Sequence, residues 1–96
     1  MRFTWDTAKN DANKRKHGIG FTEAKQLFSS GVDYLEIFDE AHSGREDRFI
    51  AIGPIRRGLV LLVWTERGED VIRIISARWA TPREAQLYHQ HKEERR

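Results

Sequence analysis

Four short apolar runs with the two-residue period of β-strands fill the middle of this chain and constrain its fold more than any other feature. They are rich in Ile, Val, Leu and aromatic residues, which favour strands. The runs are Tyr34 to Phe38, Arg48 to Gly53, Leu59 to Glu66 and Val71 to Ala77. Short connections that contain glycine separate the last three runs, as in β-hairpins. We therefore expect a four-stranded antiparallel sheet.

Two helices are predicted before the first strand. Asp6 is a typical N-cap for a helix over residues 7–17, and Gly18 can end that helix in the left-handed conformation. A second, shorter helix is predicted over residues 21–28, with Thr22 as its N-cap. Both helices are expected to pack against the sheet.

A third helix is predicted after the last strand. Thr81, Pro82 and Glu84 match a capping box with proline at the first helical position. The fold class is therefore α+β, with two N-terminal helices, a four-stranded antiparallel sheet and a C-terminal helix. Because 96 residues cannot divide their buried surface between two cores, we expect residues 1–96 to form a single domain.

Two arginines mark the last predicted strand. Because side chains alternate between the faces of a sheet, Arg73 is expected beside Val71 and Ile75, whereas Arg78 is expected beside Ile74. This alternation puts the two arginines on opposite faces. Helices on one side of the sheet should leave the other side partly free, and the sequence does not decide which arginine it carries.

Charge is unevenly distributed along the chain, although the net charge is only +2. Residues 1–20 carry five Lys or Arg against two Asp or Glu, residues 21–47 carry two against seven, and residues 48–96 carry ten against six. Such segregation can give one positive face for a polyanion and one negative face for a basic partner. An ordinary solvated surface explains it equally well.

The composition points to a cytoplasmic protein that does not enter a membrane. The chain has no cysteine, which fits a reducing compartment. No apolar stretch approaches the roughly 18 residues of a membrane span, and the N-terminus lacks the apolar run of a signal peptide.

Metal, cofactor and covalent chemistry find little support in the sequence. The four histidines are dispersed, and neither an HExxH motif nor a carboxylate cluster is present. There is no cysteine nucleophile, no Gly-x-Ser-x-Gly turn and no dinucleotide-binding loop. We expect neither a metal site nor a cofactor.

A set of cations with a few proton carriers remains, and it suits phosphodiester chemistry. Its members are Lys16, His17, Arg48, Glu66, Arg67, Arg73 and Arg78. RNA can be cut without a metal when a base deprotonates the 2′-hydroxyl, cations stabilise the phosphorane and an acid protonates the leaving oxygen. Structural roles are open as well, because Lys16 and His17 suit a helix C-terminus, and cross-strand salt bridges are the usual role of arginines on a half-solvated sheet.

Two of the tryptophans invite different interpretations. Trp64 lies inside an apolar run and is expected in the core. Trp79 follows Arg78 and precedes the C-terminal helix, so it is the better candidate for stacking on a base.

Several stretches together resemble the BrnT family of toxins, from Phe3 to about Tyr88. The stretches are Phe3-Thr4-Trp5-Asp6 with Lys9-Asn10, Lys16-His17-Gly18-Ile19 with Phe21 and Ala24, Arg48 to Gly53, Thr65-Glu66-Arg67, and Ile72 to Arg78. The resemblance implies a fold similar to RelE-type ribonucleases and a metal-independent endoribonuclease that inhibits translation. It also implies RNA as the substrate and a BrnA-like ribbon-helix-helix antitoxin as the partner. The toxin would contact DNA only through this antitoxin. The expected assembly is a dimer or a toxin–antitoxin heterotetramer.

The resemblance also implies which residues act. The catalytic candidates are His17, Glu66, Arg67, Arg73 and Arg78, and the candidates for binding RNA phosphate or bases are Lys16, Arg48 and Trp79. We prefer Glu66 or His17 for proton transfer and the arginines for phosphate. Trp79 departs from the family pattern, which often has a basic residue there. The alternative is a non-catalytic module that binds nucleic acid or protein, or a degenerate toxin that only binds its antitoxin.

Overall fold

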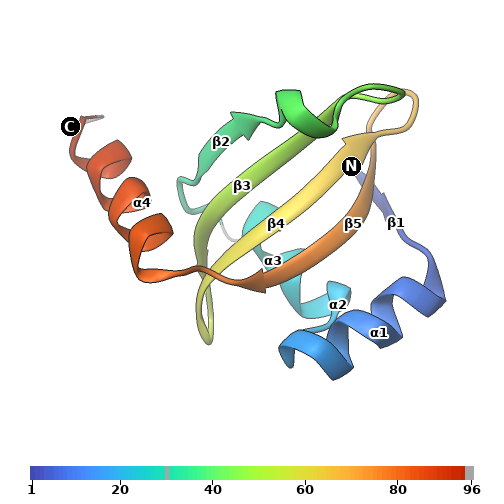
Figure 1. Ribbon diagram of the computed structural model, residues 1–96, viewed down its shortest axis with the longest axis horizontal. Helices are drawn as coiled ribbons and strands as arrows, with labels where there is room; N and C mark the ends of the chain where they lie inside the picture. Colours follow the sequence, from blue (N-terminus) through green and yellow to red (C-terminus); the bar gives the residue numbers. More distant parts are fainter. Residues whose placement is uncertain (30, 95–96) are drawn as a thin grey trace.

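A computed structural model describes residues 1–29 and 31–94, so Ser30, Arg95 and Arg96 lie outside it. Its elements are β1 (Arg2–Thr4), α1 (Thr7–His17), α2 (Phe21–Ala24), α3 (Gln26–Ser29), β2 (Leu35–Phe38), the 3₁₀ helix η1 (Glu40–His42), β3 (Arg48–Ile55), β4 (Gly58–Glu66), β5 (Val71–Trp79) and α4 (Pro82–Glu94). The strands form one sheet in the order β1-β5-β4-β3-β2 (Figure 1). The prediction of an α+β fold is confirmed.

The predicted caps of the first and last helices are confirmed. The Asp6 carboxylate accepts hydrogen bonds from the backbone N–H groups of Ala8 and Lys9, at 2.8 and 3.3 Å. Gly18 follows the helix with φ +71°, which glycine adopts without strain. The capping box of α4 closes as expected, because Thr81 N–H donates to Glu84 at 2.9 Å and Glu84 N–H donates to Thr81 Oγ1 at 3.2 Å.

The prediction of a four-stranded, all-antiparallel sheet is wrong in its count and in one pairing. β1 adds a fifth strand, and it runs parallel to β5, with Phe3 opposite Ile72. The other three pairings are antiparallel. A strand of three residues is too short to show a two-residue hydrophobic period, so no sequence pattern marked it.

The second predicted helix is also corrected, because it divides into α2 and α3. Thr22 is not its N-cap. The cap position is Gly20, and the side-chain oxygen of Asn10 on α1 accepts the Phe21 N–H at 2.8 Å. A side chain distant in sequence thus replaces the local cap, which explains why the local pattern misplaced it.

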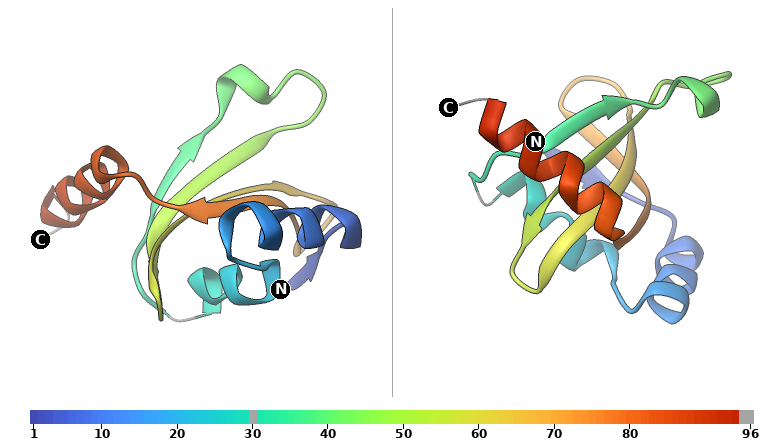
Figure 2. Two further views of the ribbon diagram at one scale, coloured as in Figure 1. Left: turned by 60° about the horizontal axis from the view of Figure 1, so that its bottom comes forward. Right: turned by 60° about the vertical axis from the view of Figure 1, so that its left-hand side comes forward.

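The two faces of the sheet are covered unequally. Helices α1, α2 and α3 pack on one face, over a core that includes Phe21, Leu62 and Ile74 and the predicted core residue Trp64, which is 3% exposed. On the other face, α4 packs against β2 and β3, with Tyr88 as its one buried residue. Figure 2 shows α4 well apart from α1 to α3. The half of this second face that lies over β4 and β5 is therefore less covered.

A β-bulge in β5 sets the direction of its arginines. Ser76 pairs with Val63 and Ile74 pairs with Trp64, so Ile75 is an extra residue on β5. The bulge shifts the alternation by one position, and Arg73 and Arg78 consequently point to the same face, the one that carries α4. The expectation of opposite faces is wrong for this reason.

The side chain of Asn13 protects the edge of β5 beyond the short strand β1. This residue of α1 is 7% exposed, and its amide pairs with both backbone groups of Ala77, accepting from N–H at 3.1 Å and donating to C=O at 2.7 Å. It also donates to the Ile19 carbonyl at 2.8 Å. The amide thus takes the place that a continuation of β1 would occupy beside the second half of β5.

None of the helices in the described ranges is both long enough and apolar enough to cross a membrane.

Candidate nucleic-acid interface

Two arginines and a threonine form a row across three strands on the less covered face. Arg48 of β3 pairs with Thr65 of β4, and Thr65 pairs with Arg73 of β5. Thr65 is buried, and its hydroxyl donates to the Asp47 carbonyl at 2.6 Å. With strands about 4.8 Å apart, the two arginine Cα atoms lie about 10 Å from each other. We call Arg48, Thr65 and Arg73 the arginine row.

The guanidinium groups of the row have little compensation from acidic side chains. Arg73 is half-buried, and its side chain makes no hydrogen bond or ion pair with any residue in the described part of the chain. Nε of Arg48 is buried without a hydrogen-bond partner there, and its nearest carboxylate oxygen, from Glu46, is 3.7 Å away. Buried donors of this kind favour an anionic acceptor, because leaving them unpaired costs free energy.

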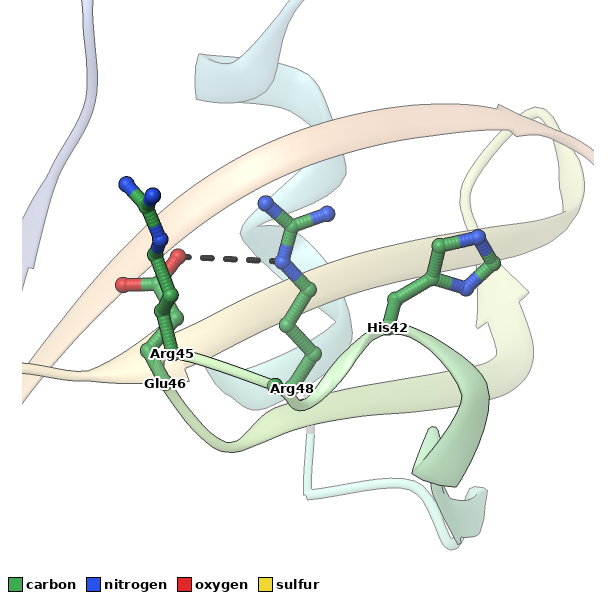
Figure 3. Close-up of a pocket in the computed structure, with 5 residues that line it drawn as sticks. His42, Arg45, Glu46 and Arg48 are labelled. Atoms are coloured by element: carbon green, nitrogen blue, oxygen red, sulfur yellow. Dashed lines mark ion pairs between the residues drawn. The ribbon is translucent and has the colours of Figure 1, made fainter.

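A hollow of about 530 Å³ adjoins the row at Arg48. Its lining comes from η1 and the following loop: His42, Gly44, Arg45, Glu46 and Arg48. Figure 3 shows Arg48 between Glu46 and His42, with these side chains on one side of the loop. Two arginines against one glutamate make the hollow an environment that suits an anion.

A histidine and an aspartate are joined at the edge of this hollow. Nδ1 of His42 lies 3.0 and 3.2 Å from the two carboxylate oxygens of Asp39. Sequence reasoning treated His42 only as one of four dispersed histidines and missed this pair. The signal was present in the spacing Asp39-x-x-His42, followed by Arg45 and Arg48 in an otherwise acidic segment.

Glu66 and Arg67 lie close to the row but are directed elsewhere. Glu66 is exposed, and it pairs with Ile72, whose side chain belongs to the helix-covered core, so it points away from the face of Arg73. Arg67 donates from Nη2 to the second carboxylate oxygen of Glu46 at 3.1 Å. Glu46 thus contacts two of the predicted cations, Arg48 and Arg67.

Arg78 shares the face of Arg73 but is occupied by an acidic neighbour. Its two terminal nitrogens donate to the two carboxylate oxygens of Glu84 at 2.7 and 2.8 Å. These hydrogen bonds lower the pKa of Glu84 from 4.5 to about 2, and they raise the pKa of Arg78. The pair joins the end of β5 to the first turn of α4.

The remaining predicted residues lie away from the row. Lys16 is exposed and His17 half-buried at the C-terminal end of α1, which packs against β5 from the helix-covered side. Trp79 packs against the helix-covered core, and the guanidinium of Arg57 lies 5.0 Å above its ring. Arg57 in turn donates to both carboxylate oxygens of Glu23. The ring of Trp79 is thus covered by the guanidinium of Arg57 within the fold.

No three His, Asp or Glu side chains gather in the described residues in a way that could hold a metal ion. The arginine row and its surroundings offer guanidinium groups, a histidine and a few carboxylates. Such a set can hold a phosphodiester, stabilise added negative charge on it and transfer protons.

Comparisons with known proteins agree with this chemistry. Residues 5–84 match the family described as "Ribonuclease toxin, BrnT, of type II toxin-antitoxin system". Among solved structures, the crystal structure of the Brucella abortus ribonuclease toxin BrnT aligns with a TM-score of 0.63 and 23% sequence identity, over 84% of this chain and 97% of that chain. This likeness shows a shared fold. No curated protein matches the chain.

Proposed function

This chain belongs to the BrnT family of ribonuclease toxins of type II toxin–antitoxin systems, and we propose that it cuts RNA at the arginine row without a metal ion. The family implies an RNA target and an antitoxin partner. The row supplies the part of the chemistry that a metal ion would otherwise supply, which is stabilisation of charge on the reacting phosphate.

The observation that carries the proposal is Arg73, a half-buried arginine on an incompletely covered sheet face with no acidic partner in the described residues. A guanidinium presents several donors in a plane that matches two phosphate oxygens. Arg48, on the far side of Thr65, gives the row a second guanidinium with an unpaired buried donor. The two cations favour the phosphorane, which carries more negative charge than the substrate phosphate.

The reaction proposed is attack by the 2′-oxygen of RNA on the adjacent phosphorus, with departure of the 5′-oxygen. The products are a 2′,3′-cyclic phosphate and a 5′-hydroxyl. A proton acceptor must lie beside the row for this step. Glu66 lies on the opposite face and His17 at the end of α1, so neither of the expected proton carriers adjoins Arg73.

The antitoxin proposed is a BrnA-like ribbon-helix-helix protein that neutralises the toxin in the cytoplasm and carries the DNA contact. A partner that covers the row with carboxylates would neutralise the positive charges of Arg48 and Arg73 and would also exclude RNA. The expected assembly is a toxin–antitoxin heterotetramer, which mass measurement of the co-purified complex would test.

The decisive experiment is cleavage of a 5′-labelled RNA by the purified protein in EDTA, followed by examination of the product ends. We expect cleavage with 2′,3′-cyclic phosphate ends, and a rate constant about 100-fold lower in Arg73→Ala. Arg15→Ala removes an exposed arginine on α1 and serves as the control that should cleave normally. If folded wild-type protein cuts no RNA, alone or with ribosomes, a non-catalytic binding module or a degenerate toxin replaces this proposal.

A further inference from the structure

The imidazole of His42 is presented to the hollow in one defined tautomer. A carboxylate only accepts hydrogen bonds, so in the neutral imidazole the contact with Asp39 places the hydrogen on Nδ1 and the lone pair on Nε2. The side chain of His42 is 67% exposed, whereas that of Asp39 is 15% exposed. A largely buried carboxylate thus orients an accessible proton acceptor.

The loop that carries His42 is fixed to the start of β3. Asp39 N–H donates to the Arg48 carbonyl at 2.8 Å, which continues the β2–β3 ladder by one residue. The Ser43 hydroxyl donates to the Asp39 carbonyl at 2.6 Å and accepts from Arg48 N–H at 3.0 Å. These bonds hold the His42 backbone at a set position relative to Arg48, as a catalytic group needs.

We propose that His42 is the general base of RNA cleavage and that Asp39 is its positioning residue. This inference rests on the proposed ribonuclease function and names the proton acceptor that the arginine row lacks. Arg48 lines the same hollow as His42 and belongs to the row, so the phosphate held by the arginines lies next to the imidazole (Figure 3).

The chemical step balances without a metal ion. Nε2 of His42 takes the proton of the 2′-hydroxyl, and the 2′-oxygen forms a bond to phosphorus. The bond between phosphorus and the 5′-oxygen breaks, and the leaving oxygen takes a proton from a water molecule. The imidazolium then gives its proton to the resulting hydroxide, which restores the enzyme.

Glu46 is the other proton acceptor in the hollow, and its contacts make it the weaker choice. One carboxylate oxygen lies 3.1 Å from Nη2 of Arg67 and the other lies 3.7 Å from Nε of Arg48. Both oxygens are therefore engaged by guanidinium groups and are less available to a 2′-hydroxyl. Nε2 of His42 has no such competitor among the described residues.

The test compares cleavage with RNA affinity in His42→Ala. We expect the cleavage rate constant to fall about 100-fold or more, the usual contribution of a general base. Affinity for an RNA made uncleavable by a 2′-deoxy substitution should stay within about twofold, because the imidazole acts on the proton and not on the phosphate. Free imidazole should restore part of the cleavage. His89→Ala removes an exposed histidine of α4 and should cleave like the wild type.

Asp39→Asn tests whether Asp39 acts through His42 and not only through the fold. If it acts only through His42, the double variant with Asp39→Asn and His42→Ala should cleave no more slowly than His42→Ala alone, since the effects of coupled residues are not additive. Should His42→Ala lose its native circular dichroism, His42→Gln takes its place with the same expectations.

Three outcomes would overturn the assignment of His42. They are cleavage by His42→Ala within about threefold of wild type, a parallel loss of RNA affinity, and no rescue by imidazole. In each of these cases wild-type cleavage in the same assay leaves the ribonuclease proposal standing. A folded wild type that does not cleave overturns the ribonuclease proposal, and the role of His42 with it.

Discussion

Arg73 and Arg78 occupy the same strand and the same sheet face, yet their neighbours differ completely. Arg78 meets the Glu84 carboxylate with two hydrogen bonds of 2.7 and 2.8 Å and joins β5 to α4. Arg73 has no such partner in the part of the chain that the structure describes. The role of a sheet arginine therefore depends on whether a carboxylate comes within reach, and this information lies outside the strand itself.

The two arginines also differ in what would be lost with them. Removing Arg78 leaves a partly buried Glu84 without its cation, so the free energy of unfolding should decrease. Removing Arg73 takes away a charge that nothing in the described fold uses, so the cost should appear only when a phosphate is bound. Both arginines share a face only because of the bulge at Ile75, so the alternation of side chains around the bulge is the first feature to change.

Insertion of one alanine between Ser76 and Ala77 should have the largest effect on stability. With the bulge at Ile75 kept, every side chain after the inserted residue turns to the other face, which takes Ala77 and Trp79 out of the core and moves Arg78 away from its present side. We expect a loss of about 3 kcal/mol or more in the free energy of unfolding, or failure to fold. Denaturant unfolding followed by circular dichroism measures it.

Ile75→Ala is the control for this insertion, because it keeps the residue count and removes only a half-buried side chain. It should cost about 1 kcal/mol. Similar stabilities of the two variants would mean that the face on which the side chains after the bulge lie does not determine the stability of β5.

Arg73→Ala should have the next largest effect, on catalysis. The expected loss of about 100-fold in the cleavage rate constant corresponds to about 2.7 kcal/mol of transition-state stabilisation. The free energy of unfolding should stay within about 0.5 kcal/mol of wild type, as for other surface charges. Arg73→Lys keeps the charge but not the planar fork, and should recover only part of the rate. A large drop in stability would assign Arg73 to the fold instead.

Arg78→Ala should reverse this pattern. We expect a loss of about 1 to 2 kcal/mol in the free energy of unfolding, less than a fully buried pair would give because Arg78 is 37% exposed. At a temperature where the variant is fully folded, cleavage should fall much less than in Arg73→Ala. An equal loss of cleavage in a folded Arg78→Ala would show that this arginine reaches the substrate as well.

Sequence reasoning predicted the parts of the fold that local patterns determine. Asp6, Gly18 and the Thr81–Glu84 box were found because caps act within a few residues, and three antiparallel strand pairings followed from alternation and short turns. β1 was missed because its partner, β5, is distant in the chain. Asn13 was missed for the same reason, since its hydrogen bonds reach Ala77 across the fold.

The candidate site was predictable only in part. Arg48 and Arg73 were singled out as cations on strands, and the strand register brings them into one row. The direction of Arg78 was not predictable, because nothing local marks a bulge at Ile75, and its partner Glu84 was interpreted only as a cap. His42 was overlooked because its proposed role depends on the contact with Asp39 and on the hollow that it shares with Arg48, and both arise only in the folded structure.

The smallest predicted effect is the pH dependence that the Arg78–Glu84 pair adds to stability. The pKa of Glu84 is about 2 in the fold and about 4.5 ordinarily, so the unfolded chain takes up its proton first as the pH falls. The contribution of the pair is therefore complete above about pH 4.5 and disappears between pH 4.5 and pH 2. We expect Glu84→Gln to lose about 1 kcal/mol less than wild type between pH 6 and pH 3, since it has no proton to bind. Urea unfolding at both pH values measures the difference. Glu93→Gln, which alters an exposed carboxylate near the end of the same helix, should follow the wild type. If the free energy of unfolding of wild type and of Glu84→Gln changes equally with pH, then Arg78 contributes no more to stability through Glu84 than Arg73 does without a partner.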